Sequence, residues 1–177
     1  IMRGADVLIA TSEWPALRQA LTELSPGVDA AATLAVIKRF QSAPQNGPAE
    51  AHQDLIDKAF AHDTVEEIVA ALERDGSEFA RTTLIALQEK SPRGLKVALK
   101  LLRLARPAKS LEECLVREYR AALEVFASAD FVEGIRAAII DKDRNPKWSP
   151  SRIEDVTPEI VARYLAPLGD QDLVFPS

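Results

Sequence analysis

Apolar positions recur at helical spacing along almost the whole chain. The clearest stripe repeats at i, i+3, i+4 and i+7, as expected of a helix with one buried face, and consists of Val65, Ile68, Val69 and Leu72. Thr64 precedes this stripe and Glu67 follows three residues later, which is the pattern of a capping box. Gly76 can adopt the left-handed conformation that ends a helix. The sequence therefore predicts a helix over residues 64–75.

Similar patterns predict helices in most of the remaining chain. They cover residues 15–24, 28–40, 49–61, 110–127, 130–141 and 158–165, with two more that begin at Ser77 and at Ser91. Signals for strands are scarce, although residues 7–10 could be extended. We therefore expect an all-α, multi-helix fold.

Two of these helices are expected to begin with further capping boxes and to bury long apolar faces. Ser110 with Glu113, and Asp130 with Glu133, have the required spacing of three residues. The side chains predicted to face inward are Leu111, Leu115, Tyr119, Ala122 and Phe126 in the first helix, and Phe131, Ile135 and Ile139 in the second.

Composition narrows the functional classes. The 177 residues are 47% hydrophobic and 28% charged, which is enough apolar surface for a folded core. The net charge of −5 argues against a general nucleic-acid partner, because such proteins need a surplus of Lys and Arg. No apolar run approaches the roughly 20 residues that span a bilayer. No signal peptide is recognisable, and the Ile1 start is expected of a piece of a longer protein; a cytoplasmic location is predicted.

The usual catalytic and metal-binding signatures are missing. No metal site is predicted, because the spacing of His52, His62 and Cys114 is not that of metal ligands. Cys114 is interpreted as a buried, inert thiol. The carboxylates of residues 66–67 and 112–113 lie in first helical turns, where they stabilise the helix dipole. No residue of this chain is therefore assigned a catalytic role.

Residues 141–148 form the most unusual segment. Its sequence, Asp-Lys-Asp-Arg-Asn-Pro-Lys-Trp, has two interpretations. In the first, it is a solvated turn in which Trp148 packs on the core and the charges pair with one another. In the second, Lys142, Arg144 and Lys147 form a basic rim that contacts a phosphorylated ligand, and Trp148 covers an aromatic base. Both remain open from the sequence alone.

The same segment resembles the C-terminal region of 3-hydroxyisobutyryl-CoA hydrolases, members of the enoyl-CoA hydratase/isomerase (crotonase) superfamily. The likeness extends over residues 50–175 and more loosely over 1–49. The motifs that carry it are residues 130–137 (Asp-Phe-Val-Glu-Gly-Ile-Arg-Ala), 140–148, 64–68, 75–79, 91–96, 118–120 and 156–159. The Asp-Phe-x-Glu-Gly part is common to the superfamily, whereas the Asp-Lys-Asp-x-x-Pro-Lys-Trp extension favours the hydrolases.

This resemblance implies a fold and an activity. The chain would be the C-terminal helical domain of a crotonase-like fold, over residues 49–177, with residues 1–48 a helical segment and linker. The N-terminal core of ββα units would be absent, and with it the oxyanion hole and the catalytic carboxylates. The parent enzyme would cleave 3-hydroxyisobutyryl-CoA in valine breakdown, and this chain by itself would be inactive. Two alternatives stay open: a hydratase or isomerase, and a free-standing helical interaction module without an active site.

The resemblance also implies partners. Acyl-CoA would be the substrate, so CoA enters as part of it and no separate cofactor is expected. Lys142, Arg144, Lys147 and Trp148 are the candidates for CoA contact, with Lys142 the first choice for a phosphate. The chain would pack on its own N-terminal core, and an apolar face left open would favour a homo-oligomer. Gly134, inside a predicted helix, suggests close approach of a ligand or of another helix.

Overall fold

The computed structural model describes residues 7–43, 47 and 49–175, which form two compact units divided after Ala51. In the first unit, a 3₁₀ turn at Thr11–Glu13 leads into helix α1 (Trp14–Thr22), and α2 (Ala30–Lys38) packs against α1. Asp29 caps α2 through the backbone N–H of Ala32. Residues 7–10 form no strand but contribute an isolated bridge between Ile9 and Gln41.

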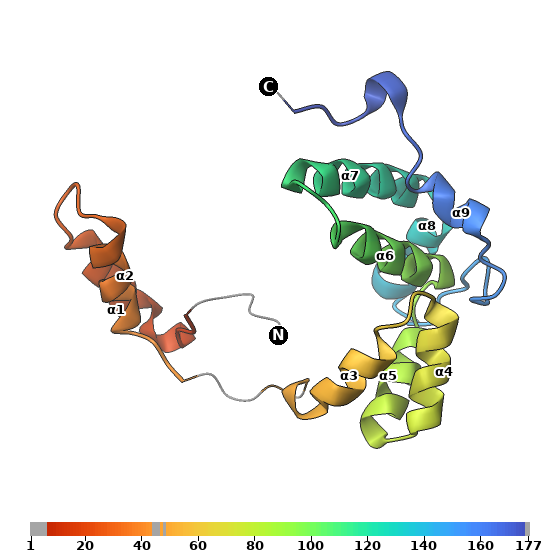
Figure 1. Ribbon diagram of the computed structural model, residues 1–177, viewed down its shortest axis with the longest axis horizontal. Helices are drawn as coiled ribbons and strands as arrows, with labels where there is room; N and C mark the ends of the chain where they lie inside the picture. Colours follow the sequence, from red (N-terminus) through yellow and green to blue (C-terminus); the bar gives the residue numbers. More distant parts are fainter. Residues whose placement is uncertain (1–6, 44–46, 48, 176–177) are drawn as a thin grey trace. The chain divides into compact units, whose positions relative to one another are not determined.

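The second unit contains helices throughout, as Figure 1 shows. Their bounds are α3 Gln53–Ala59, α4 Val65–Asp75, α5 Glu78–Gln88, α6 Pro92–Ala105, α7 Leu111–Ala127, α8 Ala129–Ile135 and α9 Pro158–Arg163. A π-helical turn, η3 (Arg136–Ile140), extends α8, and a 3₁₀ turn lies at Gly169–Gln171. A further 3₁₀ turn, Glu50–His52, contains the point at which the two units divide. No β-strand forms within residues 7–43 and 49–175. None of the helices in these ranges has the length and apolarity that crossing a membrane requires.

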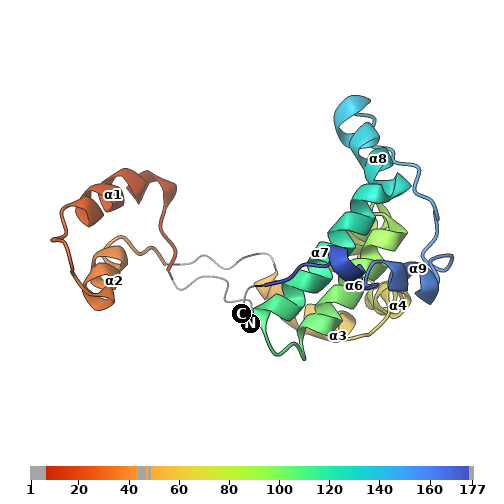
Figure 2. The same cartoon turned by 90° about the horizontal axis from the view of Figure 1, so that it is seen from above.

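Two small cores hold this unit together. In the first, α4 packs against α3 and α5 around Leu72 and Ala80, which are fully buried. In the second, α6 packs against α7 and α9 through Val97, Ala121 and Tyr164. Both views place α6 and α7 side by side (Figures 1 and 2). Because α6 also contacts α4, it joins the two cores.

Helix starts follow the local sequence closely. The predicted capping box of Thr64 and Glu67 is confirmed, because each side chain accepts the backbone N–H of the other residue. Gly76 ends α4 with a φ of 62°, in the left-handed region. The hydroxyls of Ser77, Ser91 and Thr157 cap α5, α6 and α9 as expected.

The other two predicted capping boxes differ from the structure. Ser110 does cap α7, but the Glu113 carboxylate accepts from the N–H of Lys109 instead of Ser110. The prediction of a capping box formed by Asp130 and Glu133 was wrong. Ser128 caps α8 instead, and Asp130 lies inside the helix. Ser128 directly precedes the first residue of α8, so its hydroxyl can accept a free N–H of the first helical turn.

Several side chains predicted to be buried are exposed. Leu111 is 69% exposed, Phe126 62% and Ile139 64%. Their spacing is helical, yet among the described residues of the second unit no element buries these three side chains. Helical periodicity shows that a helix has an apolar face, but it does not show whether another layer covers that face. The predicted burial was therefore wrong for these three positions.

The segment after α9 is held by a charge pair. Arg120, on α7, donates to both carboxylate oxygens of Asp172, and Nε lies 2.9 Å from Oδ1. This bidentate contact lowers the pKa of Asp172 and raises that of Arg120. It fixes the segment that follows the 3₁₀ turn Gly169–Gln171 against α7.

Candidate functional site: a charged loop and a cavity beside α6

The first candidate site is the loop of residues 141–148, called here the 141–148 loop. It begins where η3 ends, and its backbone folds back on that turn. The N–H of Asp141 donates to the carbonyl of Arg136 at 2.8 Å, and the N–H of Arg144 donates to the carbonyl of Ala137 at 3.0 Å. These bonds hold the loop against η3, the turn that extends α8.

Arg136 gathers the acidic residues around this loop. Its Nε and Nη2 donate to the two oxygens of Glu133 at 2.9 and 2.8 Å, which is a bidentate pair. Nη1 donates to Asp141 and to Asp143, both at 2.7 Å, and Nη2 also donates to the carbonyl of Asn145 at 3.2 Å. A guanidinium has five N–H donors. All five are used, so Arg136 is saturated.

Glu133 binds both Arg136 and the backbone of the loop. Besides Arg136, its Oε1 accepts the backbone N–H of Lys147 at 2.6 Å. The hydrogen bonds from Arg136 and Lys147 hold the pKa of Glu133 at about 2, well below its usual 4.5. Hydrogen bonds from Arg136 and from the N–H of Asn145 likewise lower the pKa of Asp143, and the same carboxylates raise that of Arg136. Glu133, Asp143 and Arg136 are therefore ionised at neutral pH.

The basic residues of the loop lie outside this cluster. Lys142, Arg144 and Lys147 are exposed. Lys142 and Arg144 have φ angles of 56° and 55°, a left-handed conformation that non-glycine residues adopt rarely. No hydrogen bond or ion pair from the side chains of these three residues occurs within the described ranges of the chain. The loop therefore separates its charges, with the acids on Arg136 and the cations facing solvent.

Trp148 anchors the end of the loop. Its indole Nε1–H donates to the carbonyl of Glu89 at 3.1 Å. A Cβ placed at Gly134 would lie 3.4 Å from Cη2 of Trp148, so the ring covers that glycine. The close approach expected at Gly134 is thus made by the chain's own tryptophan. This contact matches the first interpretation for Trp148, whereas stacking on an aromatic base stays a prediction.

Asp130 is a buried carboxylate that the sequence pattern did not reveal as such. It is 8% exposed and accepts the hydroxyl of Ser91 and the N–H of Ser149, the latter at 3.1 Å. Ser91 also caps α6 through the N–H of Gly94. Asp130 therefore ties the start of α6 and the segment after the 141–148 loop to α8. It also lines a cavity of about 420 Å³ bordered by α6, α7 and α8.

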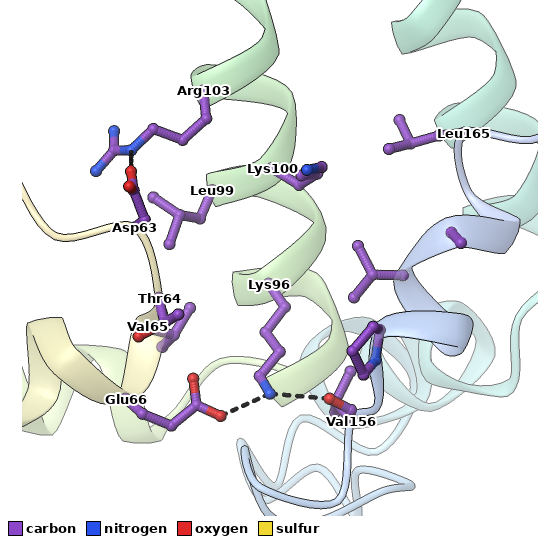
Figure 3. Close-up of a pocket in the computed structure, with 13 residues that line it drawn as sticks. Asp63, Thr64, Val65, Glu66, Lys96, Leu99, Lys100, Arg103, Val156 and Leu165 are labelled. Carbon is purple, nitrogen blue, oxygen red and sulfur yellow. Dashed lines mark hydrogen bonds and ion pairs between the residues drawn. The ribbon is translucent and has the colours of Figure 1, made fainter.

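The second candidate site is a cavity of about 740 Å³ beside α6, called here the α6 cavity. Its walls come from the start of α4, from α6 and from the α9 region, and they include Val65, Leu99, Val156, Pro158, Val161, Ala162 and Leu165. Figure 3 shows Lys96 reaching Glu66 on one side and the carbonyl of Val156 on the other, at 2.6 and 2.8 Å. Arg103 pairs with Asp63 at 3.0 Å and also donates to the carbonyls of Phe60 and His62.

Lys100 lies between these two cations on α6, four residues after Lys96 and three before Arg103. It carries no ion pair or hydrogen bond among the described residues. The cavity therefore offers apolar walls and a single available positive charge. This i, i+4, i+7 spacing places all three basic side chains on one face, and it is the sequence signal that could have revealed the cavity.

The residues to which the sequence analysis assigned no catalytic or metal-binding role take part in the fold. The ring of His52 stacks on Phe79 with centroids 4.2 Å apart, and Cys114 is half-buried on α7. Glu67 completes the cap of α4, and Glu66 pairs with Lys96. Within the described ranges, no three His, Cys, Asp or Glu side chains come close enough to hold a metal ion.

Comparisons with known proteins agree on one protein family. The model of the enoyl-CoA hydratase/isomerase family matches residues 2–165. A probable 3-hydroxyisobutyryl-CoA hydrolase from Arabidopsis thaliana is 45% identical over 134 residues, which are 70% of this chain and 35% of that protein. A carnitinyl-CoA dehydratase from Mycobacterium thermoresistibile is 31% identical with a TM-score of 0.84, and an enoyl-CoA hydratase from Rhodobacter sphaeroides is 39% identical with a TM-score of 0.80. Each structure covers 97% of this chain, which spans 47% of that structure.

These matches correct the predicted fold class. We expected an all-α C-terminal domain of a crotonase-like fold, well matched over residues 50–175 and only loosely over 1–49. The family match begins at residue 2, and the two similar structures cover 97% of the chain, so its assignment as a C-terminal fragment was wrong. The helical pattern describes the elements of the chain, but periodicity carries no information on which portion of a larger fold they occupy.

Proposed function

The chain belongs to the enoyl-CoA hydratase/isomerase (crotonase) family and is similar to its 3-hydroxyisobutyryl-CoA hydrolases, and on that premise we propose that it serves in the hydrolysis of an acyl-CoA thioester. The proposed substrate is 3-hydroxyisobutyryl-CoA. The identity of 45% to a probable hydrolase of that compound supports this choice. CoA is then part of the substrate, and no other cofactor is invoked.

The proposed contribution of this chain is to bind the CoA portion. Hydrolysis of a thioester needs donors that stabilise the oxyanion and a carboxylate that moves a proton. We assign neither role to a residue of this chain. The observation that carries the proposal is the separation of charge in the 141–148 loop, which leaves Lys142 and Arg144 exposed. Cations of this kind form strong charge-assisted hydrogen bonds to phosphate oxygens, and CoA carries several phosphate groups.

A binding experiment tests this role directly. The chain is titrated with CoA and with pantetheine, which lacks the phosphates, in a calorimeter. We expect saturable binding of CoA, weak binding of pantetheine, and a loss of CoA affinity of about tenfold in Lys142→Ala, the size of one charge-assisted contact. Lys109→Ala is the matched control, because it removes an exposed lysine outside the loop. Equal affinities for the two compounds would refute the proposal.

Activity is tested in two forms of the protein. The chain by itself is expected to release no thiol from 3-hydroxyisobutyryl-CoA. In a longer family enzyme that contains this sequence, Lys142→Ala is expected to raise KM for the acyl-CoA and leave kcat nearly unchanged, because the contact is the same in substrate and transition state. An unchanged KM would exclude Lys142 from the site.

Hydration of an enoyl-CoA is the second candidate function. The identity of 39% to an enoyl-CoA hydratase of known structure favours it. The longer enzyme would then add water to crotonyl-CoA faster than it hydrolyses a thioester. A non-catalytic interaction module remains the third alternative, and failure of the chain to bind CoA would favour it.

Assembly and location are further proposals. The exposed apolar side chains on α7, α8 and η3 support a homo-oligomer or packing on a core of the same enzyme, which light scattering of the chain and of the longer enzyme would distinguish. A cytoplasmic location remains a prediction.

A further inference from the structure

The sequence of the 141–148 loop does not by itself favour an anion. Residues 141–144 alternate in charge, Asp-Lys-Asp-Arg, and sum to zero. If Lys142 and Arg144 paired with the neighbouring carboxylates, Lys147 would be the one cation of the loop left for a phosphate. The structure avoids this pairing, and the residue responsible lies outside the loop, at the start of η3.

We infer that Arg136 is the positioning residue of this anion-binding edge, an inference that rests on the proposed function. Its guanidinium binds Asp141 and Asp143, and within the described residues neither carboxylate forms an ion pair with Lys142 or Arg144. Glu133 binds the same guanidinium and ties the N–H of Lys147 to the cluster. The acids of the loop are thereby held on Arg136, and the side chains of Lys142 and Arg144 stay exposed.

Only an arginine can make this arrangement. The cluster uses five N–H donors from one planar group toward four residues: Glu133, Asp141, Asp143 and Asn145. A lysine ammonium has three donors and no planar fork. Arg136 is 28% exposed, so its contacts are less screened than those of a surface pair. It also supports the left-handed backbone of Lys142 and Arg144, since Asp141 and Asp143 flank Lys142 and are both fixed.

The inference predicts a specific loss in Arg136→Met. Without the guanidinium, Asp141 and Asp143 become available to Lys142 and Arg144 and cancel their charge. We expect the affinity of the chain for CoA to fall about tenfold or more, and its affinity for pantetheine to stay unchanged. Arg136→Lys keeps the charge, guards against a loss of fold and is expected to lose an intermediate amount. Arg152→Met is the matched control, because Arg152 is 70% exposed and pairs with Glu154 alone.

A rescue variant separates positioning from a merely structural role. Adding Asp141→Asn and Asp143→Asn to Arg136→Met removes the carboxylates that would cancel the cations. The inference predicts that CoA affinity returns to within about threefold of the wild type, although the cluster is still broken. Circular dichroism and thermal melts of each variant establish that the helices are retained.

The outcomes are distinguishable. If the wild type binds CoA no better than pantetheine, the proposed function fails and this inference fails with it. If the wild type prefers CoA and Arg136→Met binds it equally well, the proposed function stands and Arg136 is not a positioning residue. If Arg136→Met loses affinity and the two Asn substitutions restore none of it, the arginine acts only through the fold, and the inference is overturned.

Discussion

The α6 cavity and the 141–148 loop use the same kinds of charged side chain in opposite ways. In the cavity, Lys96 and Arg103 each bind one carboxylate from another part of the chain, Glu66 and Asp63. In the loop, a single arginine binds three carboxylates from its own vicinity. Lys96 and Arg103 therefore join elements, whereas the loop cations are left for solvent or a ligand.

This difference shows that the number of charges in a segment does not indicate what they do. Lys96 is 18% exposed at its side chain and connects α6 with α4 and with Val156, so its charge stabilises packing. Lys142 has a carboxylate on each side in the sequence, yet within the described part of the chain it forms an ion pair with neither. Four predictions test the contrast, in order of decreasing effect.

The largest effect is expected from Lys96→Met. This change removes two contacts of a largely buried ammonium and leaves Glu66 and the carbonyl of Val156 without a donor. We expect the free energy of unfolding to fall by about 1.5–3 kcal/mol, the range for hydrogen bonds to charged groups. Urea denaturation measures it. Lys100→Met is the control and should change stability by less than about 0.5 kcal/mol; equal losses would contradict the contrast.

The next effect concerns the anchor of the loop. Gly134→Val places two methyl groups where the ring of Trp148 lies, and we expect a loss of about 1–3 kcal/mol, as in overpacked cores. Trp148 fluorescence, followed in a Trp14→Phe background, should shift to the red as the ring is displaced. Gly134→Ala is the milder comparison, because a single Cβ would lie 3.4 Å from the ring. A Val variant with unchanged emission would show that the ring does not need this surface.

A smaller effect depends on pH. The pKa of Glu133 is lowered to about 2 from 4.5, so its ionised form is favoured in the folded state. Its stabilisation is complete above about pH 4.5 and is lost as the pH falls toward 2. Glu133→Gln should therefore lower the melting temperature at pH 6 and narrow its difference from the wild type at pH 3. A difference that stays constant across this range would contradict the ionised cluster.

The smallest effect is expected from Lys142→Gly. The backbone there has a φ of 56°, which a glycine adopts without steric cost. We expect stability to rise by about 1 kcal/mol or less, since relief of strain is partly offset by the greater entropy of glycine in the unfolded chain. Thermal melts measure it. A marked loss of stability would mean that the Lys142 side chain holds the loop, as Lys96 holds the cavity.

Local features of this protein are those that the sequence predicts best. The caps by Thr64, Ser91 and Thr157 and the stop at Gly76 each depend on residues at most four positions apart. A hydroxyl three residues before a free N–H satisfies it wherever the helix lies. The family resemblance was likewise readable, because it rests on contiguous motifs between residues 64 and 159.

The candidate site was predictable only in part. The sequence singled out residues 141–148 and their cations, but it left open whether the charges cancel. It also assigned Asp130 to a helix cap, although Asp130 is buried against Ser91 and Ser149. The error about Asp130 arises because its partner Ser91 lies 39 residues away in the sequence, and a local pattern carries no information on so distant a contact.

The sequence by itself determined that the chain is helical, the caps at Thr64, Ser91 and Thr157, which helix faces are apolar, and the family, because these follow from spacing and from short motifs. Tertiary structure alone decided which apolar faces are covered, that Lys96 meets Glu66 and Arg103 meets Asp63 across about 30–40 residues, and that Arg136 withdraws the acids from the loop. The physical reason is the distance along the chain over which each interaction acts. Capping acts within one helical turn, whereas charge and burial depend on every group that folding brings within a few ångströms.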